Sequence, residues 1–230
     1  MCRYTKKRRQ RGGSQSGKVY VFYHIYCMKD TMRIVKEQCM RIIFSGLYTR
    51  VDAIHCFLAG EEKVIKEIKK MLENFGKKFT VTREGPGDTS HERFTLEKIP
   101  DYVKPEDKFL YIHSKGIKHG DSEPVYWWRT YLEYCVIGRY KECLEKLNDH
   151  DVVGANFSNR LIGKHFSGNF WWSTGKYFMT LSKKIGATYH DPEKYVMTNS
   201  SAKHFDIDAG RVPENRILYF ENIYPKEYVD

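Results

Sequence analysis

The sequence predicts an α/β fold, with an open and mostly parallel sheet flanked by helices in a single domain. Short β-branched and aromatic runs alternate with segments of helical spacing through the first half of the chain. This alternation favours a parallel sheet covered by helices. The chain has 230 residues and 41% hydrophobic content, which suits one domain with a sizeable core.

The expected strands of the first half are compact apolar runs bounded by turn residues. They are residues 18–25, 53–58, 78–82 and 108–112. Apolar residues at helical spacing predict helices over residues 31–44 and 60–72, and a short helix is expected at 95–102. Asp30 is the expected N-cap of the first helix. The first half therefore has the order β-α-β-α-β-α-β.

The second half carries fewer regular signals. An aromatic-rich segment predicts a long helix over residues 123–147, and a strand is expected at 151–155. A further helix is expected at 176–185 and a late strand at 216–220. The sequence contains neither an internal repeat nor a second linker, so these elements are assigned to the same domain.

Residues 1–17 are expected to form a disordered basic arm, and residues 18–230 the folded domain. The net charge of +10 suggests an anionic partner, such as nucleic acid, a membrane surface or a phosphorylated small molecule. Much of the excess lies at residues 6–11, ahead of a glycine- and serine-rich run. A solvated tail is favoured over a targeting arm. Without it the domain is only modestly basic, so no nucleic-acid partner is expected.

The six cysteines form no C-x-x-C pair and show no zinc-ligand spacing. Several lie in apolar segments, where a cysteine behaves as a small hydrophobe. A reducing, cytoplasmic location is therefore expected. The start of the chain lacks the apolar core of a signal peptide, and no apolar run reaches the roughly 18 residues that a membrane span needs.

Residues 165–172, His-Phe-Ser-Gly-Asn-Phe-Trp-Trp, are the most informative segment. Indole faces beside small polar side chains suit the apolar C–H faces and hydroxyl rim of a sugar. The alternative is a core or interface plug, and for Trp127 and Trp128 that alternative is favoured. The expected sugar- and acceptor-binding residues are His165, Ser167, Gly168, Asn169, Trp171 and Trp172.

A second polar segment, His113-Ser-Lys-Gly116, follows the fourth expected strand. Open parallel sheets bind ligands beyond the carboxyl ends of their strands. Lys115 can neutralise phosphate there, and Gly116 allows close approach of the backbone. The alternative is an ordinary polar turn with a solvated lysine. Upstream, Glu92 could accept hydrogen bonds from a ribose or a base, although helix capping by Ser90 or Thr95 is the interpretation that the sequence favours.

Acidic residues near the end of the chain are the candidate catalytic groups. Asp206 and Asp208 form an Asp-x-Asp, and carboxylates so spaced can share a divalent cation. A general base needs a carboxylate within reach of the acceptor hydroxyl. Glu221 and Asp208 are the preferred candidates, and the competing carboxylates are Asp191, Glu193 and Glu214.

Five segments in this order resemble small GT-A-type glycosyltransferase domains. They are residues 23–26, 45–48, 92–96, 111–116 and 165–172. The chain is similar to the rhamnan-synthesis-protein-like group and to the chlorovirus N-terminal glycosyltransferase domain, and related domains occur in large algal and amoebal DNA viruses. The resemblance covers about residues 18–224, and its last two segments are the specific ones.

The resemblance implies a GT-A-like, Rossmann-like fold and transfer of a sugar from a nucleotide-diphosphate donor to a hydroxyl of a glycan or glycoprotein. For a viral chain it implies the host cytoplasm. In an inverting transfer Glu221 or Asp208 would deprotonate the acceptor. The donor-binding residues it implies are His24, Tyr26, Gly60, Glu92, His113, Ser114, Lys115 and Gly116.

The chain departs from the GT-A pattern at one point. GT-A enzymes usually end the strand corresponding to residues 109–112 in Asp-x-Asp, which holds a divalent metal such as Mn or Mg. This sequence has His113-Ser-Lys115 instead. Lys115 would then supply positive charge to the leaving diphosphate, and a metal could still enter through Asp206 and Asp208.

Two other functions are consistent with parts of the sequence. A degenerate transferase that lost its metal motif would be a non-catalytic carbohydrate- or nucleotide-binding domain. A nucleic-acid-binding protein would use the basic arm and exposed aromatic residues, and its binding would depend steeply on salt. The aromatic residues are not interleaved with the basic run, which disfavours nucleic acid.

Overall fold

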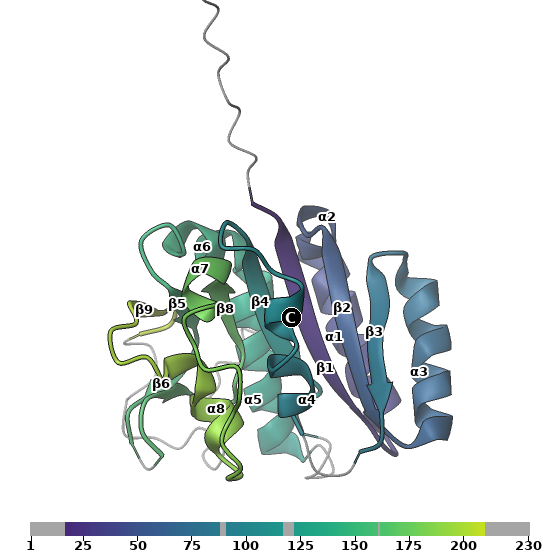
Figure 1. Ribbon diagram of the computed structural model, residues 1–230. Helices are drawn as coiled ribbons and strands as arrows, with labels where there is room; N and C mark the ends of the chain where they lie inside the picture. Colours follow the sequence, from purple (N-terminus) through teal and green to yellow (C-terminus); the bar gives the residue numbers. More distant parts are fainter. Residues whose placement is uncertain (1–16, 88–90, 117–121, 161, 210–230) are drawn as a thin grey trace, which may run out of the picture.

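The computed structural model describes residues 17–87, 91–116, 122–160 and 162–209. These residues form a seven-stranded sheet in the order β3-β2-β1-β4-β8-β5-β9 (Figure 1). Its strands are β1 (Val19–Cys27), β2 (Ala53–Gly60), β3 (Phe79–Gly85), β4 (Lys108–His113), β5 (Val152–Gly154), β8 (Trp171–Thr174) and β9 (His204–Asp206). A separate two-stranded sheet pairs β6 (Phe157–Ser158) with β7 (His165–Phe166).

The sheet is parallel except at one strand of the described chain. β1 pairs in parallel with both β2 and β4, β2 pairs in parallel with β3, and β5 pairs in parallel with β9. β8 runs antiparallel to its neighbours β4 and β5. The predicted fold class, an open and mostly parallel sheet flanked by helices in a single domain, is confirmed. The carboxyl ends of β1, β2 and β4 consequently share one edge.

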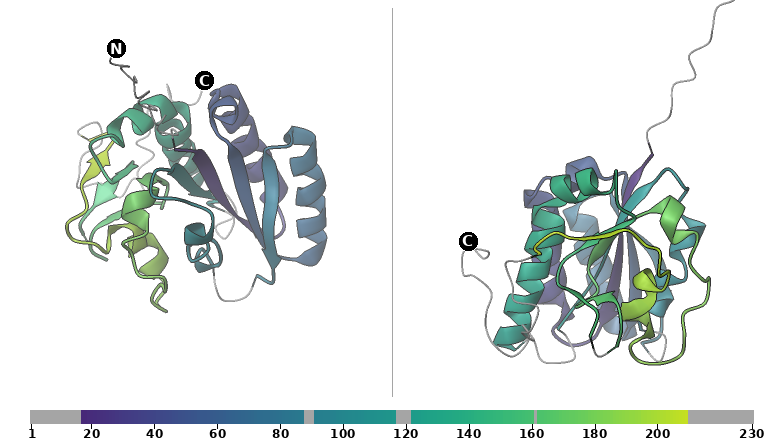
Figure 2. Two further views of the ribbon diagram at one scale, coloured as in Figure 1. Left: turned by 45° about the horizontal axis from the view of Figure 1, so that its top comes forward. Right: turned by 90° about the vertical axis from the view of Figure 1, so that its left-hand side faces the viewer.

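Helices cover both faces of the sheet. In Figure 1 the short helices α4, α7 and α8 lie in front of it, and α1 and α5 lie behind. The edge-on view of Figure 2 separates these layers. The helices are α1 (Thr31–Phe44), α2 (Leu47–Arg50), α3 (Glu62–Phe75), α4 (Arg93–Leu96), α5 (Glu123–Glu133), α6 (Tyr140–Lys146), α7 (Gly175–Phe178) and α8 (Asp191–Lys194).

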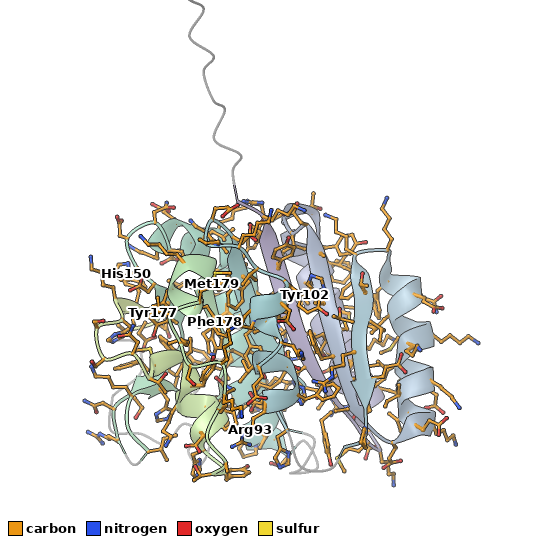
Figure 3. All side chains as sticks on the ribbon, viewed as in Figure 1. Arg93, Tyr102, His150, Tyr177, Phe178 and Met179 are labelled. Atoms are coloured by element: carbon orange, nitrogen blue, oxygen red, sulfur yellow. The ribbon has the colours of Figure 1, made fainter. Side chains whose placement is uncertain are left out.

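Two apolar cores lie on the two faces, because successive side chains of a strand point to opposite sides. Tyr23 and Trp172 belong to the core beneath the long helices, whereas Phe22 and Trp171 belong to the core beneath the short ones. Phe178 of α7 inserts into that second core (Figure 3), with its ring centroid 5.9 Å from that of Trp171. The central strands are therefore covered on both sides.

Most expected elements occur where the sequence predicts them. The four strands of the first half and the helix over residues 31–44 are confirmed. The helix expected at 95–102 is divided into α4 and the 3₁₀ turn Ile99–Asp101. The helix expected over residues 123–147 contains the π-helical turn Tyr134–Gly138 between α5 and α6. A π turn inserts one residue into the helical repeat, which the apolar spacing did not indicate.

One local prediction is wrong, and a second, Asp30 as the N-cap of α1, is right in position only. The helix expected at 176–185 ends at Phe178, and the residues that follow form turns. Asp30 has a left-handed φ of 70° and makes no side-chain cap. The entry to α1 is fixed instead by Thr31, whose hydroxyl donates to the Tyr26 carbonyl at 2.8 Å and accepts from the Met28 amide at 3.0 Å.

Some expectations fall outside the described residues. They concern the basic arm over residues 1–16 and the late strand at 216–220. Within the described ranges, no helix combines the length and the apolar character needed to cross a bilayer. The cysteines at positions 27, 39, 56, 135 and 143 are buried and unpaired, and burial raises the pKa of the Cys27 thiol to about 12. These five thiols serve as small apolar side chains.

Candidate functional site

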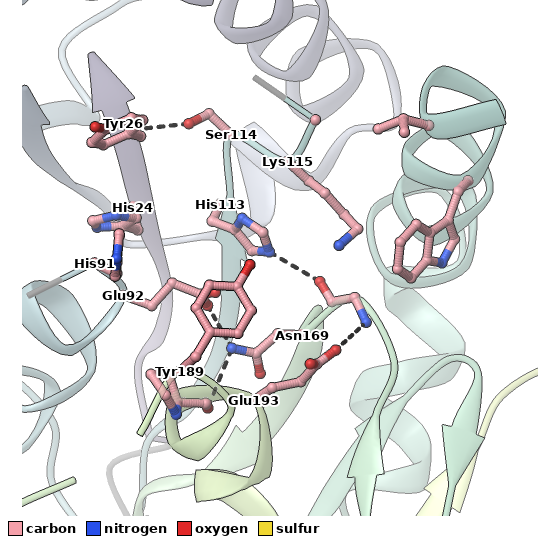
Figure 4. A pocket seen from close by; sticks show the side chains of 15 residues that line it. His24, Tyr26, His91, Glu92, His113, Ser114, Lys115, Asn169, Tyr189 and Glu193 are labelled. Carbon is pink, nitrogen blue, oxygen red and sulfur yellow. Dashed lines mark hydrogen bonds between the residues drawn. The ribbon is translucent and has the colours of Figure 1, made fainter. Parts of the chain in front are cut away.

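A pocket lies beyond the carboxyl ends of β1 and β4 (Figure 4). Seven of the eight donor-binding residues expected from the sequence, all within the described part of the chain, line it. They are His24, Tyr26, Glu92, His113, Ser114, Lys115 and Gly116. Gly168 and Asn169 reach the same pocket from the loop before β8. The chain therefore brings residues from four separate sequence segments to one edge of the sheet.

Lys115 contributes an ammonium group to this pocket. Its Nζ lies 3.8 Å from the centroid of the Trp128 ring, on α5. An ammonium over an indole face is attracted by the negative potential of the ring. Burial lowers the pKa of Lys115, while the nearby carboxylates of Glu193 and Glu92 oppose that shift. The ammonium is thus held over an aromatic wall and faces the two carboxylates.

Glu92 is oriented by a chain of hydrogen bonds that begins in the core. The indole Nε1 of Trp171 donates to Asn169 Oδ1 at 2.7 Å, and Asn169 Nδ2 donates to Glu92 Oε2. The buried Tyr111 hydroxyl donates to the same oxygen at 2.8 Å. Two donors on one carboxylate oxygen fix the Glu92 side chain at the pocket wall.

Gly168 connects the floor of the pocket to its opposite wall. Its carbonyl accepts from His113 Nε2 at 3.0 Å, and its amide donates to Glu193 Oε1 at 2.9 Å. Its φ of +94° favours glycine. A Cβ built at this position would lie 2.4 Å from Leu132 Cδ1 and 3.2 Å from the Trp128 ring. Glycine is therefore required here by both backbone conformation and space.

Two of the histidines that line the pocket, His24 and His113, are neutral at neutral pH. Burial lowers the pKa of His24 to about 4, and burial together with Lys115 lowers the pKa of His113 to about 3. Since His113 Nε2 bonds a carbonyl, that nitrogen carries the proton and Nδ1 is left as an acceptor. His24 Nδ1 lies 2.9 Å from the Thr95 hydroxyl. Of His24, His113 and Lys115, it is Lys115 that carries a positive charge at neutral pH.

Ser114 joins the ends of two strands. Its amide donates to the His24 carbonyl at 2.9 Å, and its hydroxyl accepts from the Tyr26 amide at 2.8 Å. These bonds extend the pairing of β1 and β4 by one residue beyond His113. Ser114 thus shapes the strand end from which Lys115 projects.

Trp171 and Trp172 do not form the sugar-facing wall expected from the sequence. Both are 0% exposed, and they point into opposite cores because they are neighbours on β8. The Trp172 indole donates to the Val136 carbonyl at 2.8 Å. That prediction is wrong for both tryptophans, although the Trp171 indole donates a hydrogen bond to Asn169, which lines the pocket.

Three other expected residues lie away from the described pocket lining. His165 is buried in β7, with Nδ1 2.7 Å from the Gly163 carbonyl. The Ser167 amide donates to the Asn156 carbonyl at 2.9 Å. Gly60 ends β2 with a φ of +151°, where a Cβ would lie 2.0 Å from the Cys27 carbonyl oxygen. Gly60 therefore serves strand packing rather than contact with the described pocket.

The C-terminal carboxylates are engaged elsewhere, and the expected roles of Asp206 and Asp208 are wrong. Asp208 is buried outside the described pocket lining, accepts from the Tyr131 hydroxyl at 2.6 Å and pairs with Arg139 at 3.4 Å. Asp206 accepts from the amides of Phe157 and Asp208. Two backbone amides, a tyrosine hydroxyl and a guanidinium therefore engage the carboxylate oxygens that a metal would need.

The described residues do not fit a divalent metal. They contain no group of three or more His, Cys, Asp or Glu side chains placed to hold one. At the end of β4, where the metal of a GT-A enzyme is expected, the chain presents the Lys115 ammonium. Glu221 and Glu214 lie outside the described residues.

Several pocket residues were not among the preferred sequence candidates. They are His91, Val125, Trp128, Tyr189, Pro192 and Glu193. Val125 and Trp128 are three residues apart, which places them on one helix face, but the sequence does not show where that face points. Glu193 was a competing base, and the structure places it opposite Lys115 (Figure 4). Tyr189 is 70% exposed at the pocket.

A family model described as a domain of unknown function (DUF8361) matches residues 22–204. No curated protein matches the chain. The similar solved structures include a 4-diphosphocytidyl-2C-methyl-D-erythritol synthase, with a TM-score of 0.45 and 10% identity over 84% of this chain and 89% of that one.

The same enzyme from Anaerococcus prevotii DSM 20548 has a TM-score of 0.42 and 10% identity, over 80% of this chain and 86% of the other. The glycosyltransferase GlyE of Streptococcus pneumoniae TIGR4 has a TM-score of 0.38 and 13% identity. It is matched over 82% of this chain but only 45% of its own length.

Proposed function

The chain belongs to the family described as a domain of unknown function (DUF8361), and we propose that it is a glycosyltransferase that uses a nucleotide-diphosphate sugar. One observation carries this proposal. The strand-end residues that the sequence analysis assigned to a donor site converge on one pocket, where Lys115 faces Glu92 and Glu193. An ammonium group at the carboxyl edge of a parallel sheet suits a diphosphate.

In the proposed mechanism Lys115 stabilises the leaving group. When the bond between the anomeric carbon and the diphosphate oxygen breaks, negative charge accumulates on that oxygen. A preorganised ammonium in a partly dehydrated pocket stabilises this charge more strongly than water does. Trp128 holds the ammonium in place, and Glu92, fixed by Tyr111 and Asn169, accepts hydrogen bonds from donor hydroxyls.

Glu193 replaces Asp208 as the proposed base. Its Oε1 accepts from the Gly168 amide at 2.9 Å, which orients the carboxylate at the pocket wall. In an inverting transfer Glu193 takes the proton of the acceptor hydroxyl while the acceptor oxygen bonds to the anomeric carbon. The nucleoside diphosphate leaves with the electron pair of the broken bond. No step is assigned to a metal.

Titration of UDP, GDP and CDP, followed by transfer and hydrolysis assays over a panel of nucleotide sugars, tests the proposal. Lys115→Ala is expected to weaken diphosphate binding by about tenfold or more, because a charge-assisted contact is lost. Lys66→Ala is the matched control, since Lys66 pairs with Glu62 on the exposed face of α3. Transfer is expected to persist in EDTA.

The outcomes separate the candidate functions. Unchanged binding and turnover in Lys115→Ala would remove the proposed role of that lysine. Nucleotide or sugar binding without turnover over the whole panel would favour the non-catalytic binding domain.

A further inference from the structure

A guanidinium is completely buried beneath the Lys115 segment. Arg129 of α5 is 0% exposed. Its Nη2 lies 2.9 Å from Glu37 Oε2 on α1, and its Nε lies 3.5 Å from Glu133 Oε1 on its own helix. Burying a charged group costs several kcal/mol unless paired carboxylates and hydrogen bonds compensate it. Because its burial is so unfavourable, we expect Arg129 to have a specific structural role.

The third nitrogen of the Arg129 guanidinium binds the Lys115 segment. Its Nη1 donates to the backbone carbonyl of Lys115 at 3.2 Å. Contact between α1 and α5 does not depend on this bond, because Arg41 of α1 also pairs with Glu133 at 2.8 Å. The ion pairs join the two helices, whereas the bond to Lys115 holds the backbone of the strand end.

A second buried side chain holds the neighbouring carbonyl. Gln38 of α1 is 0% exposed, and its Nε2 donates to the His113 carbonyl at 3.1 Å. The orientation of the Gln38 amide is set by the Tyr23 hydroxyl, which donates to Oε1. The carbonyls of residues 113 and 115 are thus both anchored from the helix layer, just where the pairing of β4 with β1 ends.

We propose that Gln38 and Arg129 are positioning residues that fix the strand end from which Lys115 enters the pocket. α5 contributes twice, since Arg129 holds the Lys115 carbonyl and the adjacent Trp128 holds its ammonium. With both ends of this flexible side chain placed, less entropy is lost when it meets an anion. The anion is the diphosphate of the proposed function, on which this part of the inference rests.

The test uses Gln38→Met, Arg129→Lys and, as matched control, Arg41→Gln. Arg129→Lys keeps the positive charge but loses the planar fork that spans three partners. Arg41 belongs to the same ion-pair network and makes no described bond to the Lys115 segment. All three variants are expected to lower the melting temperature, so stability by itself does not distinguish them.

Two measurements do distinguish them. The amides of Ser114 and Lys115 are expected to exchange with solvent about tenfold faster in Gln38→Met and Arg129→Lys than in Arg41→Gln. The affinities for UDP and for inorganic pyrophosphate are expected to fall by about tenfold in the first two variants alone. Exchange needs no ligand, so it tests the positioning role independently of the proposed function.

Wild-type exchange at Ser114 and Lys115 in folded Gln38→Met and Arg129→Lys would overturn the inference. Equal loss of affinity in Arg41→Gln would also overturn it, because the effect would then reflect general stability. If exchange rises as expected while the wild-type protein binds none of UDP, GDP, CDP and pyrophosphate, the positioning role stands and the proposed function fails.

Discussion

The two tryptophan pairs of this chain exchange the roles that their local sequences suggest. Trp171 and Trp172 follow a Ser-Gly-Asn turn, yet both are completely buried on β8. Trp127 and Trp128 lie within a helix, where a core role is the ordinary expectation. Trp128 nevertheless lines the pocket against Lys115.

The difference follows from the geometry of the two elements. Neighbouring residues on a strand point to opposite faces, so a pair on the covered strand β8 enters both cores at once. Neighbouring residues on a helix are about 100° apart, so one ring of a pair can face a pocket while the other faces elsewhere. An aromatic pair thus reveals its role only when the element and its covering layers are known.

The largest effect is expected when one tryptophan of the buried pair is truncated. Trp172→Ala is expected to lower the free energy of unfolding by about 3–5 kcal/mol, because it opens a large cavity beneath the long helices. The loss also leaves the Val136 carbonyl without its indole donor. Chemical denaturation measures the effect, and the surviving folded protein is expected to bind UDP as the wild type does.

Trp127→Ala is the control for that experiment. Trp127 is partly exposed on α5 and donates to Glu123 at 3.2 Å, so its truncation is expected to cost much less. Equal costs for Trp127→Ala and Trp172→Ala would show that the contrast between core and helix surface is mistaken.

The fold was largely predictable from the sequence because its signals are local and redundant. Each strand of the first half is an apolar run between turn residues, and α1 and α3 carry a continuous apolar face. The helix expected at 176–185 failed because Phe178 and Leu181 are buried without a regular helix between them. Apolar residues at helical spacing over a few positions indicate that those residues are buried. Buried residues, however, need not lie in a helix.

The pocket was predictable only in part, for a different reason. His113 to Gly116 could be placed because the ends of parallel strands are positions set by topology. Trp128 and Tyr189 could not, since their positions depend on how α5 and the loop before α8 pack against the sheet. Asp208 was misassigned because a burial partner, Arg139, is 69 residues away in the sequence. No local sequence pattern predicts an ion pair between residues so far apart in the chain.

A second prediction concerns the pH dependence of stability, which is expected to arise from His24 in the pocket and not from the tryptophan core. His24 is buried, and burial lowers its pKa from 6.5 to about 4. Between pH 6.5 and 4 the unfolded chain binds a proton that folded His24 does not bind. Acidification in this window therefore favours unfolding, by about 3 kcal/mol once the pH falls to about 4.

His24→Gln removes this titration while keeping a polar side chain near Thr95. The difference in unfolding free energy between wild type and His24→Gln, measured from pH 7 to pH 4, is expected to shift steadily against the wild type as pH falls. A difference that stays flat over that range would contradict the burial of a neutral His24. Trp172→Ala is expected to leave this pH dependence intact.

The smallest expected effect concerns the pocket pair itself. Trp128→Leu removes the ring over which the Lys115 ammonium lies, a contact of about 0.5–2 kcal/mol. The expected change in the unfolding free energy is about 1 kcal/mol, well below that of Trp172→Ala. The affinity for UDP is expected to fall by about three- to tenfold, since the freed lysine side chain must be ordered on binding. Trp127→Leu alters the same helix one residue away and is expected to leave the affinity unchanged, so equal losses in the two variants would refute the assignment of Trp128 to the pocket.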